Sequence, residues 1–246
     1  IDCNIINLSL SVTNLYTNNL KKICMGLYQQ GKIIVSSVTN RKYSSLPASY
    51  DTVIGVRGKV FSSPMTYWFN KRDKIQLIAD MTPVFTDFRL NRYFIFSGNS
   101  KAAALASGVI AHYFSRGLVG NIEELNEYMM QNSEKQEWGK INFESQIGDF
   151  YAPVILKEDG LEMIRMKIYS LLKKHITFGQ DFSPEESLFN IGVITEITVK
   201  KLFESLSELF NITIDLKNIS PKDIVAVNNL VLAIQRICIE QGKWYV

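Results

Sequence analysis

The order of the first three regular segments constrains this fold most strongly. Residues 5–12 alternate apolar with small polar side chains, which is the period-2 pattern of a strand. A helical pattern over residues 14–31 follows, and residues 33–38 are mostly apolar and β-branched. Since a strand, a helix and a second strand in this order form a parallel pair with a crossover, the sequence predicts an α/β fold with a mostly parallel sheet and flanking helices.

The strand pattern does not persist along the chain. Strand-like runs recur until residues 98–113, which form a helical pattern rich in alanine, serine and glycine. From residue 161 onward only helical spacing remains, in three apolar stripes at residues 163–172, 199–210 and 224–237. Ser220 and Pro221 before the third stripe predict a helix cap followed by a proline at the first helical position. We therefore predict an α/β domain at residues 1–132, a linker at residues 133–160 and a small all-α bundle at residues 161–246.

Length and composition narrow the class of protein. At 246 residues the chain is long enough for two domains. Its 46% hydrophobic and 21% charged residues indicate globular domains, and a formal net charge of +3 is too small to predict a nucleic-acid partner. No apolar run reaches the roughly 20 residues that a membrane-spanning helix needs. We predict no nucleic acid and no membrane as partners.

The cysteines and the possible ligand residues show no disulfide, metal-binding or nucleotide-binding motif. Cys3, Cys24 and Cys238 lie far apart and show no CxxC spacing, which favours a reducing, cytoplasmic location. No cluster of histidine, cysteine and carboxylate residues has the spacing of metal ligands, and no glycine-rich loop suits nucleotide phosphates. We predict neither a metal nor another cofactor.

Four segments of the first domain carry a resemblance to a known family. In order along the chain, they resemble consecutive landmarks of the subtilisin-like serine proteases, or subtilases. These segments are residues 6–12, 35–40, 47–56 and 98–109. The resemblance implies that the first domain is the C-terminal half of a subtilisin-like fold, partial or truncated.

The resemblance also implies a catalytic site. Ser100 matches the nucleophile of that family, at the start of a buried helix, and Asn40 matches the asparagine that donates a hydrogen bond to the oxyanion. In this chemistry a base removes the serine proton as the hydroxyl attacks, and nearby donors stabilise the negative oxygen that results. The provisional catalytic residues are therefore Ser100 and Asn40.

The sequence offers no histidine base for this serine. His112 lies twelve residues after Ser100 on the same predicted helix, roughly 18 Å along its axis, and is too far away. His175 ends a helix of the other domain, where we expect it to be solvated. The aspartate and histidine motifs of subtilases precede the strand with which this sequence begins, so the triad is incomplete as written.

The sequence departs from the subtilase motifs around the serine. Asn99 replaces the usual threonine, Lys101 replaces a methionine, and Ala79-Asp80-Met81 stands where Ala-Pro-Gly is expected. These departures indicate weakened selection for catalysis, so Ser100 is either a nucleophile or a helix-capping residue. The aromatic residues 67–69 either line a pocket or, as is more common, belong to the core.

The second domain carries a separate resemblance. Residues 161–240 resemble an acyl or peptidyl carrier protein, most clearly at residues 186–192 and 206–212. Carrier proteins bind phosphopantetheine through a serine at the start of a helix, and Glu196 occupies that position here. A carboxylate cannot form the phosphodiester, so no phosphopantetheine is expected, with the Thr195 hydroxyl as an alternative attachment point. Otherwise Thr195 and Glu196 simply begin a helix, where a hydroxyl cap and an acidic first turn are favoured.

Two functional hypotheses follow. In the favoured one, the chain is a non-catalytic or weakly catalytic protein whose subtilisin-like groove binds a peptide or a partner protein, while residues 196–210 form a docking face. Its place in a biosynthetic pathway rests on the family resemblance alone. In the alternative, the chain is a serine hydrolase or acyl transferase that uses Ser100 and Asn40, with the histidine and aspartate supplied from outside this sequence.

The sheet itself also predicts a partner. A parallel sheet without its earlier strands exposes an unpaired edge, which is an aggregation hazard. We expect an upstream segment or another chain to complete the sheet, unless the sheet has been trimmed to a smaller stable form.

Overall fold

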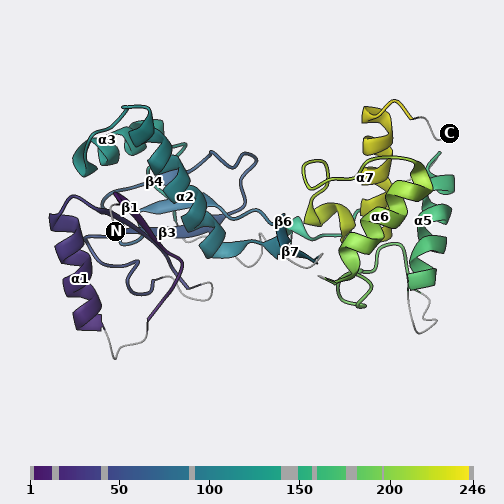
Figure 1. Ribbon diagram of the computed structural model, residues 1–246, viewed down its shortest axis with the longest axis horizontal. Helices are drawn as coiled ribbons and strands as arrows, with labels where there is room; N and C mark the ends of the chain where they lie inside the picture. Colours follow the sequence, from purple (N-terminus) through teal and green to yellow (C-terminus); the bar gives the residue numbers. More distant parts are fainter. Residues whose placement is uncertain are drawn as a thin grey trace. The chain divides into compact units, whose positions relative to one another are not determined.

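The computed structural model describes most of the chain (Figure 1). The described residues are 3–12, 17–39, 44–88, 92–139, 149–156, 160–175, 182–195 and 197–243. The chain forms two compact units: the first holds residues 1–82 and 97–146, and the second holds residues 83–96 and 147–246. Each unit has its own hydrophobic core.

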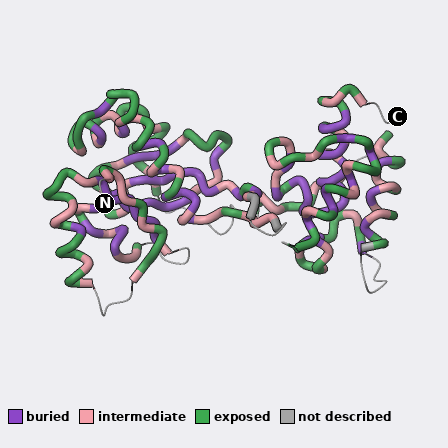
Figure 2. The backbone as a smooth tube through the Cα atoms, viewed as in Figure 1, coloured by how far each residue is buried: buried purple, intermediate pink, exposed green. Residues whose placement is uncertain are grey.

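A five-stranded sheet forms the centre of the first unit. Its strands, in spatial order, are β1 (Ile5–Leu8), β2 (Ile33–Ser37), β3 (Ile54–Lys59), β5 (Leu77–Asp80) and β4 (Trp68–Phe69). The first four are parallel, and β4 runs antiparallel to β5. All residues of β2 are buried, as expected of a parallel strand covered on both faces, and Figure 2 shows this burial along the central strands. The predicted parallel sheet is confirmed.

Two helices pack on this sheet through different kinds of side chain. The first, α1 (Thr17–Gln29), packs Cys24 in a cluster with Ile34 of β2. The second, α2 (Gly98–Ser115), contacts β1, β2, β3 and β5 and buries Ala102, Ala103 and Ala106. Because these side chains are small, the backbone of α2 can approach the strands closely, and its first turn lies against the sheet.

The first unit extends beyond its predicted end. After α3 (Ile122–Asn132), the chain returns to β4, where the Phe69 N–H donates to the Lys135 carbonyl at 3.0 Å. The Trp138 ring then lies 6.1 Å from the Trp68 ring, measured between centroids. Residues 133–139 therefore pack with the first unit, and the predicted linker at residues 133–160 begins too early.

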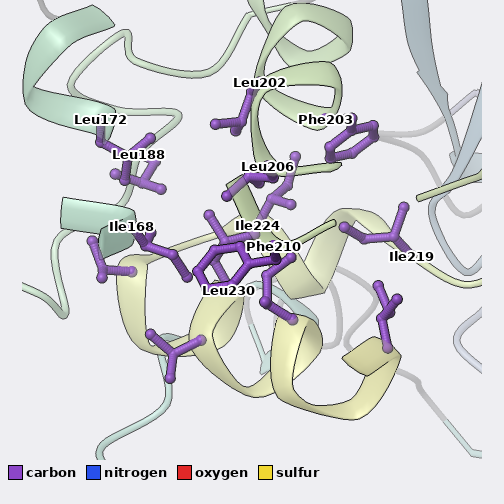
Figure 3. Packing of buried hydrophobic residues seen from close by; sticks show 14 of the residues in the cluster. Ile168, Leu172, Leu188, Leu202, Phe203, Leu206, Phe210, Ile219, Ile224 and Leu230 are labelled. Atoms are coloured by element: carbon purple, nitrogen blue, oxygen red, sulfur yellow. The ribbon is translucent and has the colours of Figure 1, made fainter. Parts of the chain in front are cut away.

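Helices dominate the second unit. They are α5 (Glu162–His175), α6 (Thr198–Phe210), the 3₁₀ turn η2 (Pro221–Ile224) and α7 (Val227–Glu240). Their apolar stripes form one core, in which Figure 3 places Ile168, Leu206, Phe210 and Leu230 around a common centre. The helix α6 ends at Asn211, whose left-handed φ of 49° is typical of a residue that terminates a helix.

The last helix begins later than the sequence predicts. Ser220 and Asp223 form a reciprocal capping box around η2, so Pro221 begins a separate turn instead of the long helix. Ala226, with an extended backbone at φ −143° and ψ 169°, then separates η2 from α7. The predicted stripe from residue 224 to 237 therefore spans two elements.

A β-hairpin from the first part of the sequence belongs to the second unit. Strands β6 (Val84–Phe88) and β7 (Arg92–Phe96) pair antiparallel and lie between β5 and α2 in the sequence. The Phe85 ring meets the Phe203 ring of α6 edge-on at a centroid distance of 5.6 Å, and Tyr93 lies 6.0 Å from the same ring. An isolated hairpin cannot bury its own apolar face, and here the helical core covers it.

This hairpin corrects the predicted domain boundaries. The sequence predicts an unbroken domain at residues 1–132, but residues 83–96 pack with residues 147–246. Residues 153–156 also belong to the second unit, since the Val154 N–H donates to the Asn229 side chain at 3.0 Å. The chain thus passes between the two units three times.

Candidate active site

The first turn of α2 presents the predicted nucleophile. Its N-cap, Ser97, has an extended backbone and makes no capping hydrogen bond through its side chain. Gly98 follows with φ +77°, in the left-handed region that favours glycine, and turns the chain sharply into the helix. Ser100 is therefore the third helical residue, where backbone N–H groups lack partners within the helix and favour negative charge.

Ser100 lies at the carboxyl edge of the parallel sheet, which is where α/β folds commonly bind ligands. Just beyond the end of β1, the Ser9 hydroxyl donates to the Ser100 carbonyl oxygen at 3.5 Å, and the Asn7 side chain donates to the Ser9 hydroxyl at 3.2 Å. The side chain of Ser100 is half-buried, and among the described residues its hydroxyl has no hydrogen-bond partner.

The residue before the serine bridges two strands of the sheet. Asn99 is buried; its Oδ1 accepts from the Gly58 N–H at 2.8 Å, and its Nδ2 donates to the Val38 carbonyl at 3.0 Å. Gly58 has no space for a side chain, because an added Cβ would lie 2.5 Å from the Cβ of Met81. The amide of Asn99 therefore ties the start of α2 to β3 and to the end of β2.

The residue after the serine forms a buried ion pair. Lys101 Nζ lies 2.6 Å from Asp80 Oδ2, and the two side chains are 7% and 3% exposed. The other carboxylate oxygen of Asp80 accepts from the backbone N–H groups of Phe61 at 3.2 Å and Thr82 at 3.1 Å, and from the Thr82 hydroxyl. Both charged residues depart from the family motif, and nothing in the sequence predicts that they pair.

Several predicted site residues fall elsewhere. Asn40 lies outside the described residues, so its assignment to the oxyanion hole stays a prediction. His112 is exposed on α2, three turns beyond Ser100, which confirms that both lie on one helix. Nothing is described of the His175 side chain, and the backbone of His175 ends α5 in the second unit.

The aromatic residues 67–69 belong to the core. Tyr67, Trp68 and Phe69 are all buried, and the Tyr67 hydroxyl bonds that of Tyr113 at 3.2 Å. Burial is the main cause that raises the pKa of Tyr67 above its ordinary value, and the hydrogen bond to Tyr113 adds to it. Of the two alternatives left open by the sequence, the core assignment is the one found.

In the second unit, the predicted carrier site is only partly described. Glu196 lies outside the described residues. The Thr195 hydroxyl lies 3.1 Å from the Thr198 hydroxyl and accepts from the Thr198 N–H at 3.2 Å, so it caps the start of α6. Beside it lies a hollow of about 200 Å³, lined by Phe85, Tyr93, Ile95, Phe189, Ile194, Thr195 and Val199. Among these lining residues, only Thr195 and Tyr93 carry a side-chain hydroxyl, so the hollow has few polar groups that could orient a ligand.

The described residues hold neither a metal cluster nor a membrane span. No group of three or more histidine, cysteine, aspartate or glutamate side chains among them could hold a metal ion. In the same part of the chain, no helix is long and apolar enough to cross a membrane. Cys3, Cys24 and Cys238 are free thiols, and burial raises the pKa of Cys24 and of Cys238.

The family comparison matches the unit that carries Ser100. A family model described as peptidase S8, subtilase family, matches residues 1–148, which is more than half of the chain. The chain belongs to the subtilase family. The subtilase match therefore includes the parallel sheet, α2 and the half-buried Ser100, while residues 149–246 lie outside it. No curated protein sequence matches the chain.

Solved structures of subtilases are similar over part of their length. One is described as S41 psychrophilic protease, with 15% identity, a TM-score of 0.42, and coverage of 52% of this chain and 48% of that one. Sphericase has 20% identity and a TM-score of 0.41, with 52% and 47% covered. A cold adapted subtilisin-like serine proteinase has 19% identity and a TM-score of 0.42, with the same coverage as sphericase. The chain spans about half the length of these proteases.

Proposed function

We propose that this chain carries the nucleophile of a subtilase-type serine hydrolase, and that Ser100 attacks the carbonyl carbon of a peptide. The Ser100 Oγ would form an ester with the acyl group while the peptide C–N bond breaks, and water would then release the acid. The proton of Ser100 passes to a base and from there to the leaving amine.

The observation that supports this proposal is the placement of Ser100. Its hydroxyl stands half-exposed in the first turn of α2, at the carboxyl edge of the sheet. A helix N-terminus stabilises negative charge that develops nearby, so this position suits a tetrahedral intermediate. Asn40, two residues beyond the Val38 carbonyl to which Asn99 donates, is the proposed oxyanion donor from the side chain.

The proposal assigns the base and its aspartate partner to residues outside this sequence. His112 is exposed three turns along the same helix, so its imidazole cannot reach the Ser100 hydroxyl. The test therefore uses the protein as its gene encodes it. Hydrolysis of a set of peptide esters should disappear in Ser100→Ala and persist in Ser115→Ala, which removes an exposed hydroxyl of the same helix. Equal activity in the two variants would contradict the proposal.

A binding role without catalysis is the second candidate, and it is the hypothesis that the sequence alone favours. What supports it is that no histidine whose side chain is described lies near Ser100. In this case the subtilisin-like groove would hold a peptide without cleaving it. Peptides captured by the purified protein should then bind equally well to Ser100→Ala and remain intact, whereas recovery of cleaved peptides would exclude this role.

For the second unit we propose a carrier-like docking domain that bears no phosphopantetheine. What supports this proposal is that one side of α6 remains exposed, at Lys201, Glu204 and Glu208, while the other side packs into the helical core. Treatment with coenzyme A and a broad-specificity phosphopantetheinyl transferase should leave the mass of the protein unchanged. A mass increase that disappears in Thr195→Val would instead show attachment at Thr195.

A further inference from the structure

The two residues that flank Ser100 are buried on nearly opposite sides of the helix. Side chains of an α-helix advance by about 100° per residue, so Asn99 and Lys101 differ by about 200° around the axis and Ser100 lies between them. Both flanking residues are 5% exposed, whereas Ser100 is only half-buried. The first turn of α2 is thus held from two sides, with the serine in the sector between them.

Each side is held by a different part of the sheet. On one side, the Asn99 amide spans the Gly58 N–H at 2.8 Å and the Val38 carbonyl at 3.0 Å. On the other side, the Lys101 ammonium meets the Asp80 carboxylate at 2.6 Å. Rotation of the first turn about its axis would break one of these contacts, and the orientation of the Ser100 Oγ depends on that rotation.

The carboxylate of the ion pair has further hydrogen-bond partners besides Lys101. Asp80 accepts from two backbone N–H groups and the Thr82 hydroxyl in addition to Lys101, so its buried charge is well compensated. A buried charge without a partner is strongly unfavourable, so Lys101 and Asp80 each require the other. The two departures from the family motif therefore form one unit.

We propose that Asn99 and the Lys101–Asp80 pair are positioning residues that fix the orientation of Ser100. This inference rests on the proposed function for its chemical meaning, but its structural content can be tested separately. It replaces the interpretation of Asn99 and Lys101 as signs of weakened selection with a defined role for both.

The first test measures backbone hydrogen exchange at residues 102–105, whose N–H groups donate to the carbonyls of residues 98–101 in the first turn of α2. Lys101→Met and Asp80→Asn each remove one partner of the pair and should accelerate exchange there about tenfold, while peptides from α7 keep their rates. The double variant removes both charges and should exchange close to the original rate, because the two effects are coupled. Lys22→Met, which removes an exposed lysine of the same unit, serves as the matched control.

Unchanged exchange at residues 102–105 in both folded single variants would overturn the proposal. Equal acceleration in the double variant would also overturn it, because it would show that the two side chains act independently. If a single variant does not fold, Asn99→Ser takes its place; its shorter side chain cannot span both backbone partners, so the same acceleration is expected.

The second test measures chemistry in the protein as its gene encodes it. The rate of labelling of Ser100 by a fluorophosphonate probe should saturate with probe concentration. Each single variant should lower the maximal rate about tenfold without changing the half-saturating concentration, and the double variant should recover. If the unsubstituted protein is not labelled, the proposed function fails, and the exchange experiment alone then decides whether these residues position Ser100.

Discussion

Replacing Phe203 with alanine tests whether the hairpin is part of the helical core. The Phe203 side chain is 4% exposed and contacts Phe85 and Tyr93 at centroid distances of 5.6 and 6.0 Å. A buried Phe→Ala change costs about 3–5 kcal/mol, of which each aromatic pair contributes about 0.5–1.5 kcal/mol. We expect Phe203→Ala to lower the free energy of unfolding of the second unit by about 4 kcal/mol.

The assay follows the two units separately by hydrogen exchange. Peptides from α7 and from β6–β7 should lose protection together, because both belong to the unit that Phe203 stabilises. Peptides from β3 in the first unit should keep theirs. Leu209→Ala, at a 38% exposed position of α6, should change stability by less than about 0.5 kcal/mol and is the matched control.

The reasoning would be refuted by either of two results. If the hairpin peptides keep their protection in Phe203→Ala while α7 loses protection, the hairpin does not depend on the helical core. If β3 loses protection to the same extent as α7, the two units do not unfold independently, and the division of the chain at residues 83–96 is wrong.

Three glycine substitutions and one labelling experiment test other parts of the structure. Gly98→Ala forces a side chain into a backbone with φ +77° and should cost about 1–2 kcal/mol in chemical denaturation; an unchanged midpoint would show that the turn relaxes. Gly58→Ala would place a Cβ 2.5 Å from the Cβ of Met81 and should lower the free energy of unfolding by about 1–3 kcal/mol. Gly108→Ala, in open space on α2, should raise it by about 0.5–1 kcal/mol. A change of the same sign in both variants would contradict this packing. Because burial raises the pKa of Cys24 and Cys238, both thiols should react with iodoacetamide at pH 8 more slowly than Cys3. They should reach the rate of Cys3 only when the protein unfolds. Rapid alkylation of Cys24 in the native protein would rule out its burial.

The sequence predicts the elements of this fold better than it predicts their partners. The strand pattern at residues 33–38 and the apolar stripe at residues 199–210 identify β2 and α6, because periodicity reports which face of an element is buried. Periodicity does not report what covers that face. Phe85 and Phe203 are more than one hundred residues apart, and nothing local indicates that the hairpin at residues 84–96, which lies within the sequence matched to the subtilase family, packs on α6.

In the candidate site too, the sequence predicts the position of a residue but not its contacts. Ser100 follows from a motif at the start of a helix, and the structure places it where the motif predicts. The pairing of Lys101 with Asp80 depends on how β5 and α2 meet, which a motif comparison does not address. One signal was present: a lysine directly before two buried alanines of a helix is expected to need a counter-charge.

The most direct test of the central claim is covalent labelling of the protein, as its gene encodes it, with a fluorophosphonate probe. Mass analysis of the digested protein should find the probe on the peptide that contains Ser100, and Ser100→Ala should abolish the label while Ser115→Ala retains it. A protein that stays unlabelled beside an active subtilase treated in parallel would contradict the claim that Ser100 is an activated nucleophile.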